Sequence, residues 1–376
     1  MITGLRLENF KAWRETGTIG LCPLTVLLGN NSSGKSSLGH SLLLLRQTVW
    51  TPSPNLTLRG DKGVYAIDLG EFEDVLHQSS GEQQHFALGF DFIDQEQGVL
   101  NVDVNYQQDS APAVSLQCAG MPAQDNNSTA PGELKNRVRR QLDHIHYLGP
   151  WRQRSLREYA LSESAPKVPG IDGQGFAELL IHAALSPVTQ EHNLLAGVEH
   201  WLQRLQLAQG LDIKSSDGSR SYQLRLQREG RLINLADAGI GVAYILPLLV
   251  MAHAVAAGST VIVEEPEIHL HPLAQAVLAD LFVEINKQRQ VQFIVETHSE
   301  HLFRRLQTLV ARQQLTTPEL AIYHIEQQQG TAQLKELQLD EFGRVHNWPS
   351  TLFGDALGET REQARRMFER QQERQR

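Results

Sequence analysis

The order of apolar and polar positions along this 376-residue chain predicts strands that alternate with helices. Alternation of apolar side chains favours a strand over residues 2–10. Short apolar runs favour buried strands, which are Leu24–Leu28, Ile145–Leu148, Thr260–Glu264 and Val291–Val295. Longer apolar segments predict helices over residues 37–50, 175–206, 240–257 and 272–287. Such alternation is typical of an α/β fold.

The remaining segments predict additions to this α/β core. Residues 63–106 are β-rich and indicate a β-lobe, with strand-like runs at Val64–Ile67, Phe86–Phe92 and Val99–Tyr106. Residues 107–133 are polar and Pro-containing, which predicts a surface loop or weakly ordered insertion. A β-hairpin is predicted over Tyr222–Leu235, and a small hairpin from Ala321 precedes a Gln- and Arg-rich helical tail. We therefore expect four parts: the first half of the core with the β-lobe (1–106), an insertion and helical subdomain (107–220), the second half of the core (221–320) and a C-terminal extension (321–376).

Composition limits the class of protein. Hydrophobic residues make up 41% of the chain, enough for a sizeable core. The formal net charge of −9 argues against a constitutively basic nucleic-acid coat but leaves room for a local basic groove. Cys22 and Cys118 are the two cysteines, so we expect no disulfide framework and a reducing, cytoplasmic location. The segment Met1–Glu8 carries charges where a signal peptide needs an apolar stretch.

Residues 240–263 imitate a membrane span, because they are mostly apolar and long enough to cross a bilayer. Pro247, His253 and the pair Gly258-Ser259 interrupt the segment, and acidic residues follow it. We therefore predict a buried helix, a turn and a buried strand, and no association with a membrane.

The run Gly29-Asn30-Asn31-Ser32-Ser33-Gly34-Lys35-Ser36 fits the phosphate-binding loop pattern G-x-x-x-x-G-K-[ST]. It follows a predicted strand and opens a predicted helix at Ser37, which is the setting that the motif requires. The backbone amides of such a loop cradle the α- and β-phosphates of a nucleotide. Lys35 would reach the β- and γ-phosphates, and the Ser36 hydroxyl would bind Mg²⁺. We therefore expect residues 29–37 to bind ATP together with Mg²⁺.

Two further predicted strands end in polar side chains. Glu264 and Glu265 end one of them, at the carboxyl edge of a parallel sheet, where α/β folds bind ligands. By position, we assign Glu264 to the metal shell and Glu265 to polarising the attacking water. The other leads into Glu296-Thr297-His298, where His298 could donate a hydrogen bond to the γ-phosphate and sense its presence. A solvated acidic loop and an ordinary structural histidine are the alternative interpretations.

The segment Leu235–Val242 places Gly239 and Gly241 before a long apolar helix. The start of such a helix is positive and rich in free amides, so it can bind phosphate. Taken alone, the segment is interpreted equally well as an ordinary helix cap.

With these four motifs in this order, the chain resembles the ABC-type ATPases of the SMC/RecF/OLD group, and most of all the small bacterial AAA-type members without a long coiled coil. The resemblance also covers Leu5–Lys11, Glu264–Pro272 and Glu296–His301. Asn347-Trp348-Pro349 and Phe353-Gly354-Asp355 look like the tail domain of unknown function seen in such proteins. The resemblance implies a P-loop NTPase of ABC-ATPase topology, with a β-rich lobe and a helical insertion.

In that group, two subunits sandwich two ATP molecules between the phosphate loop of one and the signature segment of the other. The resemblance thus implies a homodimer, with a higher assembly left open, in which Gly239 and Gly241 approach the γ-phosphate in trans and Glu267–His271 crosses the interface. The chain departs from the group's pattern at Glu264, where Asp is usual, and at Ala236, where Ser is usual. Loss of that serine hydroxyl implies slow or partner-dependent hydrolysis. Candidates for the glutamine loop are His77, Gln78, Gln83 and Gln84.

Other features have plainer interpretations. His269 and His271 would need a third protein ligand to hold zinc, so we favour a role at the interface. The densest basic stretch, with Tyr147 and Trp151 interleaved, is either a DNA or RNA contact or a solvated helix before a packed strand. Its basic residues are Lys135, Arg137, Arg139, Arg140, Arg152, Arg154 and Arg157. Fewer than 80 residues follow His298, too few for the Toprim nuclease domain appended to OLD proteins.

The sequence therefore predicts an ATPase that works as a molecular switch, in which ATP closes a dimer and hydrolysis opens it. Lys35, Glu265 and His298 would carry catalysis. Because no nuclease is expected within the chain, we predict a separate effector protein, with a nuclease as the main candidate, in anti-phage defence. A RecF-like DNA repair or maintenance ATPase and a non-hydrolysing nucleotide-gated scaffold are the alternatives.

Overall fold

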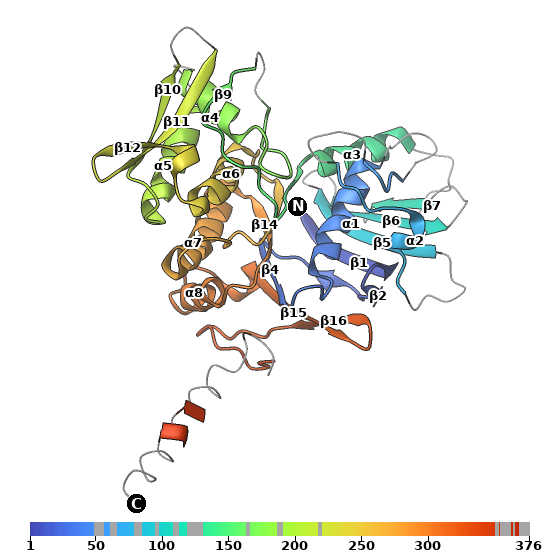
Figure 1. The fold of residues 1–376 in the computed structure, drawn as a ribbon. Coiled ribbons are helices and arrows are strands. Elements are labelled where there is room, and N and C mark those ends of the chain that lie inside the picture. The colour runs from blue at the N-terminus through green and yellow to red at the C-terminus, as the bar shows by residue number, and fades with distance from the viewer. Residues whose placement is uncertain are drawn as a thin grey trace, which may run out of the picture.

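The structure is a computed structural model, and it describes residues 1–48, 56–60, 66–78, 85–94, 98–107, 113–118, 131–162, 166–185, 191–216, 220–349, 353, 362–363 and 365–367. Figure 1 shows a central sheet between a group of helices on one side and an N-terminal β-lobe on the other. A smaller sheet with its own helices lies above the helical side.

The central sheet has the strand order β16-β15-β4-β14-β13-β8. Neighbours from β15 to β8 are parallel, and β16 is antiparallel to β15. The strands are β4 (Leu24–Gly29), β8 (Ile145–Leu148), β13 (Thr260–Glu264), β14 (Gln292–Glu296), β15 (Leu320–Gln328) and β16 (Thr331–Glu336). The four buried strands predicted from apolar runs are confirmed, and they lie side by side. Their carboxyl ends consequently meet at one edge of the sheet.

Successive side chains of these strands enter two different cores. Val26 and Val263 belong to the core on the helical side, whereas Leu27 and Ile262 belong to the core shared with the β-lobe. Because both faces of the sheet are covered, the parallel strands consist of continuous apolar runs rather than alternating ones.

Helices α6 (Ile240–Ala254), α7 (Pro272–Arg289) and α8 (Glu300–Ala311) supply the helical side, and α1 (Lys35–Gln47) covers the opposite face. Three of them confirm predicted helices. Helix α8 was not predicted, although its apolar residues have helical spacing and Ser299 caps it by accepting the amide proton of Leu302.

The β-lobe is an antiparallel sheet of order β2-β1-β5-β6-β7, with β3 paired to β1. Its elements are β1 (Ile2–Phe10), β2 (Trp13–Glu15), β3 (Ile19–Gly20), β5 (His85–Asp94), β6 (Gly98–Gln107) and β7 (Ala113–Cys118), with α2 (Phe72–Val75) and α3 (Pro131–Asp143). Strand β7 shows that the loop predicted over 107–133 is wrong for residues 113–118. Its short alternation was masked by the polar flanks. Of the strand predicted at residues 64–67, the first two residues lie outside the described ones and the last two are in no strand.

A third, antiparallel sheet joins β9 (Tyr159–Ala160), β10 (Gly210–Ser215), β11 (Ser221–Arg228) and β12 (Arg231–Asn234). Helices α4 (Phe176–Leu185) and α5 (Glu191–Arg204) accompany it, and η1 (Leu235–Asp237) leads back to α6. The predicted hairpin and helices are confirmed. Pairing of β10 with β11 crosses the boundary predicted at residue 220, and β15 crosses the one at 320. The four-part division stays a prediction.

The C-terminal part docks on α8. After η2 (Thr317–Glu319), β15 and β16 form the predicted hairpin. The rings of Trp348 and Phe353 then lie 5.6 Å and 5.5 Å from that of Phe303. Within the described part of the tail, helical residues are 362–363 and 365–367. No described helix combines the length and apolar character needed to cross a membrane, and residues 240–263 form α6, a turn and β13 as predicted.

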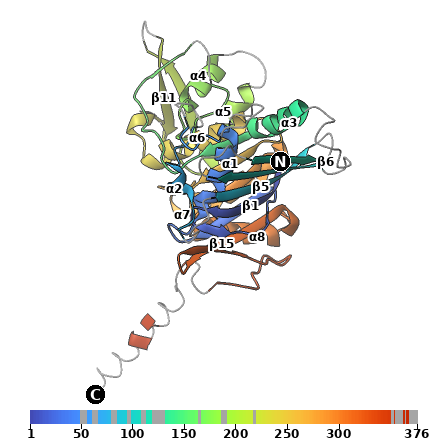
Figure 2. The same ribbon diagram turned by 90° about the vertical axis from the view of Figure 1, so that its right-hand side faces the viewer.

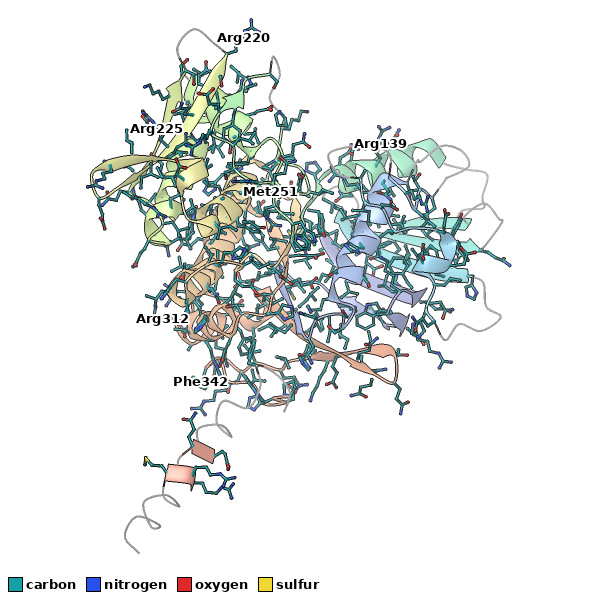
Figure 3. The ribbon with its side chains drawn as sticks, in the orientation of Figure 1. Arg139, Arg220, Arg225, Met251, Arg312 and Phe342 are labelled. Carbon is teal, nitrogen blue, oxygen red and sulfur yellow. The ribbon has the colours of Figure 1, made fainter. Side chains whose placement is uncertain are left out.

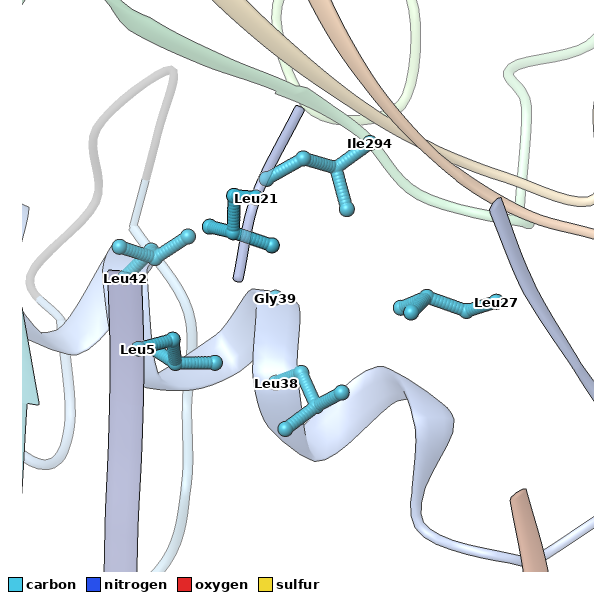
Figure 4. A pocket seen from close by; sticks show the side chains of 7 residues that line it. All are labelled: Leu5, Leu21, Leu27, Leu38, Gly39, Leu42 and Ile294. Atoms are coloured by element: carbon cyan, nitrogen blue, oxygen red, sulfur yellow. The ribbon is translucent and has the colours of Figure 1, made fainter. Parts of the chain in front are cut away.

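One small cavity lies beneath α1. Figure 4 shows its lining of apolar side chains around Gly39, which are Leu5, Leu21, Leu27, Leu38, Leu42 and Ile294. Because the lining offers a nucleotide no polar side chain, this cavity is a packing feature of the core.

Candidate functional site

The phosphate loop connects β4 to α1, which is the setting that its motif requires. Gly29 has a φ of 152°, and a Cβ at this position would lie 2.0 Å from the carbonyl oxygen of Ile325, so only glycine fits. Gly34 is the N-cap of α1, and neither a side-chain cap nor an acidic residue satisfies the first turn. The start of α1 is therefore suited to an anionic ligand.

Lys35 and Ser36 both reach the end of β14. Lys35 is 3% exposed, and its Nζ donates to the carbonyl oxygens of Gly29 and Asn30 at 3.0 and 2.7 Å. The same Nζ lies 3.7 Å from Glu296 Oε1. Ser36 Oγ donates to the two carboxylate oxygens of Glu296, at 2.9 and 3.2 Å. Burial lowers the pKa of Lys35, and Glu296 opposes that shift.

These residues fit a nucleotide and its metal. The lysine is desolvated and bonded only to loop carbonyls besides its neighbouring carboxylate, so a phosphate can replace those carbonyls as its partner. Within the described residues, the buried hydroxyl of Ser33 has no hydrogen-bond partner. Mg²⁺ is held by one or two protein oxygens plus phosphates and water, so Ser36 with a carboxylate suffices.

Glu264 stands in register with Glu296 on the neighbouring strand. Its Oε1 accepts a hydrogen bond from the Tyr147 hydroxyl at 2.8 Å, and its backbone carbonyl accepts one from Arg152 Nη2 at 3.2 Å. Burial raises the pKa of Glu264, and hydrogen bonds from Tyr147 and Ser36 lower it in part. Glu264 thus lies one strand beyond Glu296, the carboxylate that Ser36 contacts.

Glu265 and His298 also come together, with Glu265 Oε1 3.6 Å from His298 Nε2. Glu265 has a φ of 46°, which turns the chain sharply after β13, and its amide donates to the Glu296 carbonyl at 2.8 Å. The buried Glu267 accepts the amide proton of His298 at 2.7 Å and fixes that loop. Burial and the charge of Lys35 lower the pKa of His298. The ring is therefore neutral near pH 7 and can donate one hydrogen bond.

The segment Leu235–Gly241 faces outward at its centre. Gly239 is the N-cap of α6 without a side-chain cap, and Ile240 is 53% exposed. Among the described residues, Arg157 donates to the Asp237 carboxylate and Asn234 accepts from the Ala236 amide. No polar side-chain contact among these residues joins the segment to the phosphate loop. Gly241 is packed more tightly, because a Cβ there would lie 2.5 Å from the carbonyl oxygen of His269.

The loop after β13 is partly buried and partly exposed. Glu267 is buried, whereas His269 and His271 are exposed, and the His269 ring meets Tyr244 edge-on at 4.9 Å. No three His, Cys, Asp or Glu side chains of the described residues gather as a metal site. Leu273, at the start of α7, is 66% exposed.

The two candidates for the glutamine loop that the structure describes do not form part of this cluster. His77 is 2% exposed, and its ring contacts the Lys11 carbonyl and the Thr331 hydroxyl, which is a packing role. Gln78 is exposed, and Gln83 and Gln84 lie outside the described residues.

The basic stretch does not form one surface. Arg137 and Arg152 are buried, and Arg157 pairs with Asp237. Arg139, Arg140 and Arg154 are exposed, and Figure 3 shows Arg139 on the outer side of α3. The side chain of Lys135 lies outside the described residues. A nucleic-acid contact here would rest on Arg139 and Arg140 rather than on the whole stretch.

Four residues of the site have contacts that sequence reasoning did not predict. Tyr147 and Arg152 were considered for a nucleic-acid contact and Glu267 for the interface loop, and Glu296 was given no role. Glu296 had a signal, because it ends an apolar strand as Glu264 does. Tyr147 and Arg152 reach the site because β8 pairs with β13, which no local pattern reveals.

Family comparisons match two parts of the chain. Residues 182–303 match the AAA ATPase domain, and this region includes the signature segment, both acidic strand ends and His298. Residues 315–363 match a protein family of unknown function, DUF3696. A search of curated proteins found no match.

Solved structures with the same fold include SMC heads. The SMC head domain from Thermotoga maritima has a TM-score of 0.52 and 13% identity, over 90% of this chain and 99% of that one. An SMC head bound to the C-winged helix domain of ScpA has a TM-score of 0.57 and 13% identity, over 90% of this chain and 98% of that one. A third structure is an SMC head with an extended coiled coil, bound to the C-terminal domain of ScpA derived from Pyrococcus furiosus. It has a TM-score of 0.51 and 13% identity, over 90% of this chain and 96% of that one.

At this identity the likeness to SMC heads shows the fold, which confirms the predicted P-loop α/β class with a β-lobe. The described residues contain no long coiled coil. Residues 182–303 are therefore similar to an AAA ATPase domain and residues 315–363 to DUF3696, on a chain whose fold is that of SMC heads.

Proposed function

We propose that the chain is an ATP-hydrolysing switch whose ATP-bound heads pair and thereby control a separate effector protein. One observation carries the proposal. Lys35 and Ser36 contact Glu296 at the end of β14, and Glu265 after β13 contacts His298, whereas Gly239 and Ile240 lie exposed on another element. A phosphate-binding half and an open signature half on one chain are what a composite site between two copies requires.

Each residue has a role that follows from its surroundings. Lys35 exchanges its bonds to the loop carbonyls for bonds to the phosphates. Ser36 would bind Mg²⁺ and Glu264 would belong to the metal's shell, and the ion would neutralise phosphate charge when it is bound. Glu265 orients the attacking water and takes its proton, and the neutral His298 donates to the γ-phosphate.

The second copy would supply its signature segment. Gly239 has open space around it and Ile240 is exposed, so a partner's nucleotide could approach the start of α6. The exposed part of Glu267–His271 and Leu273 would line the same interface. A cytoplasmic location and an anti-phage role with a nuclease effector belong to this proposal.

The test is Glu265→Gln, assayed by ATP turnover and by size exclusion with light scattering in ATP and Mg²⁺. We expect turnover to fall about 100-fold or more and a nucleotide-bound dimer to persist. Glu300→Gln is the matched control, because Glu300 is a partly exposed acid at the start of α8 that pairs with Arg304 in the next turn. Unchanged turnover in Glu265→Gln would contradict the catalytic assignment. Binding and dimerisation without turnover in the unmodified chain would favour the non-hydrolysing scaffold.

A second candidate function, DNA repair or maintenance, has exposed Arg139 and Arg140 in its favour. DNA-stimulated turnover that disappears in an Arg139→Glu, Arg140→Glu variant would support it. Arg137 should stay unchanged in this experiment, because it is buried and its replacement would disturb folding.

A further inference from the structure

Glu296 has more contacts with the phosphate loop than either acid assigned from the sequence. Both of its carboxylate oxygens accept from Ser36 Oγ, and one of them lies within ion-pair distance of Lys35 Nζ. The residue is 7% exposed and stands at the end of β14. No other carboxylate among the described residues has a hydrogen bond to Ser36 as short as 2.9 Å.

The strand order explains this position. Strand β14 lies between β4, which leads into the phosphate loop, and β13, which carries Glu264. Glu296 is therefore one strand closer to Ser36 than Glu264 is. The Tyr147 hydroxyl and the backbone contact of Arg152 also hold Glu264 toward β8, on the far side from β4.

The separation of Ser36 from Glu296 suits a shared metal ion. Mg²⁺ binds oxygen ligands at about 2.1 Å in an octahedron, so two adjacent ligands stand about 3.0 Å apart. Ser36 Oγ and the two carboxylate oxygens of Glu296 are 2.9 and 3.2 Å apart. A metal ion could bind these oxygens with little movement of either side chain, while the Ser36 hydroxyl keeps its proton and turns it toward another acceptor.

We propose that Glu296 is a direct carboxylate ligand of the nucleotide-bound Mg²⁺ beside Ser36, and that Glu264 acts from the outer shell. The inference rests on the proposed nucleotide-binding function and adds a ligand to it. It also accounts for three acids, Glu264, Glu265 and Glu296, around the single lysine of the loop, since a divalent cation supplies the charge that Lys35 alone does not.

The experiment measures how much Mg²⁺ strengthens binding of a non-hydrolysable ATP analogue. The dissociation constant of the analogue from the full chain is measured by calorimetry in EDTA and again in Mg²⁺. The ratio of the EDTA value to the Mg²⁺ value is then compared among variants. Glu296→Gln should reduce the ratio by more than the roughly tenfold that loss of an outer-shell partner costs, and should leave metal-free binding equal or tighter. Glu264→Gln is the matched comparison, because it makes the same change at the register partner, and its ratio should change much less.

A double-mutant cycle sharpens the test. Ser36→Ala should reduce the ratio as well. Combining it with Glu296→Gln should lower the Mg²⁺-dependent binding free energy by less than the sum of the two single losses, since both ligands serve one ion. Metal-free binding also reports whether each variant is folded.

The outcomes separate the two proposals. A lost Mg²⁺ effect in Glu264→Gln with a retained one in Glu296→Gln would overturn the assignment of Glu296 and leave the proposed function standing. Loss of metal-free binding in Glu296→Gln would also overturn it, because Glu296 would then act on the structure of the loop. An unmodified chain that binds no nucleotide in either condition would refute the proposed function itself.

Discussion

The phosphate-loop half and the signature half of the site differ in how completely the chain surrounds them. Lys35 is 3% exposed, and each of its polar contacts lies within the same chain. In the signature half, Gly239 has no atom within 4 Å of where a Cβ would stand, and Ile240 is 53% exposed. The first half is preorganised by its own fold, whereas the second presents an open surface.

This difference distinguishes two motifs that each place glycines before a helix. In the phosphate loop, Gly29 is required by the backbone of Ile325 within the chain. At Gly239 the isolated chain imposes no such requirement, so any need for glycine there would come from a second molecule. Substitutions in the two halves should consequently affect different measurements.

The largest effect is expected in the closed half. Lys35→Ala removes charge-assisted hydrogen bonds to the phosphates and should weaken ATP binding about 100-fold, equivalent to about 3 kcal/mol. Calorimetric titration measures it. Lys287→Ala is the control, because Lys287 bonds only to the Gln314 carbonyl at an exposed site and its loss should leave the affinity unchanged. Equal affinity in Lys35→Ala would mean that phosphates bind elsewhere.

The carboxylates packed into the closed half should also make stability depend on pH. Burial, with Glu264 nearby, raises the pKa of Glu296 to about 7, from an ordinary value of 4.5. The folded state thus holds a proton that the unfolded state releases. This contribution to stability is complete below about pH 4.5 and is lost as the pH rises through about 7.

The free energy of unfolding should therefore fall between pH 5 and pH 8, by at most about 3 kcal/mol from this group. Urea denaturation at the two pH values measures the change. Glu296→Gln should remove most of the difference, whereas Glu300→Gln should retain it. An equal pH dependence in Glu296→Gln would show that other groups cause it.

Two glycines at the start of α6, Gly239 and Gly241, differ in how tightly the chain packs around them. Gly241→Ala places a Cβ 2.5 Å from the His269 carbonyl oxygen, and overpacking of this kind costs about 1–3 kcal/mol. Gly239→Ala meets open space at a φ of −58°, and its stability should change by less than about 0.5 kcal/mol. Urea denaturation compares them. Only Gly239→Ala should remain fully folded while pairing of ATP-bound heads weakens, and unaltered pairing would refute the trans role of Gly239.

The smallest effect is expected at the exposed ion pair that ties Arg157 to Asp237 beside the signature segment. Solvent screens such a pair, so Arg157→Ala should leave the thermal midpoint unchanged. A clear loss of stability would instead show that this contact holds the signature half in place as firmly as the buried contacts hold the other half.

Much of the site could be predicted because its motifs are local. The phosphate loop, the acidic end of β13 and the histidine after β14 each lie within a few residues, next to apolar runs whose burial confirmed the strands. The strand β7 was not predicted because polar segments flank its short alternation. The helix α8 was not predicted either, although its apolar residues have helical spacing. The roles assigned to Glu264, Glu265 and His298 stay predictions until they are measured.

The sequence by itself determined which residues can hold a nucleotide, because glycines, a lysine and a hydroxyl at fixed spacing suffice to shape a phosphate loop. Only the tertiary structure decided which acid stands beside that loop. Strand order depends on long-range pairing, and it placed β14 rather than β13 next to β4. For the same reason, the contacts of Tyr147 and Arg152 with Glu264 could be seen only after β8 had paired with β13.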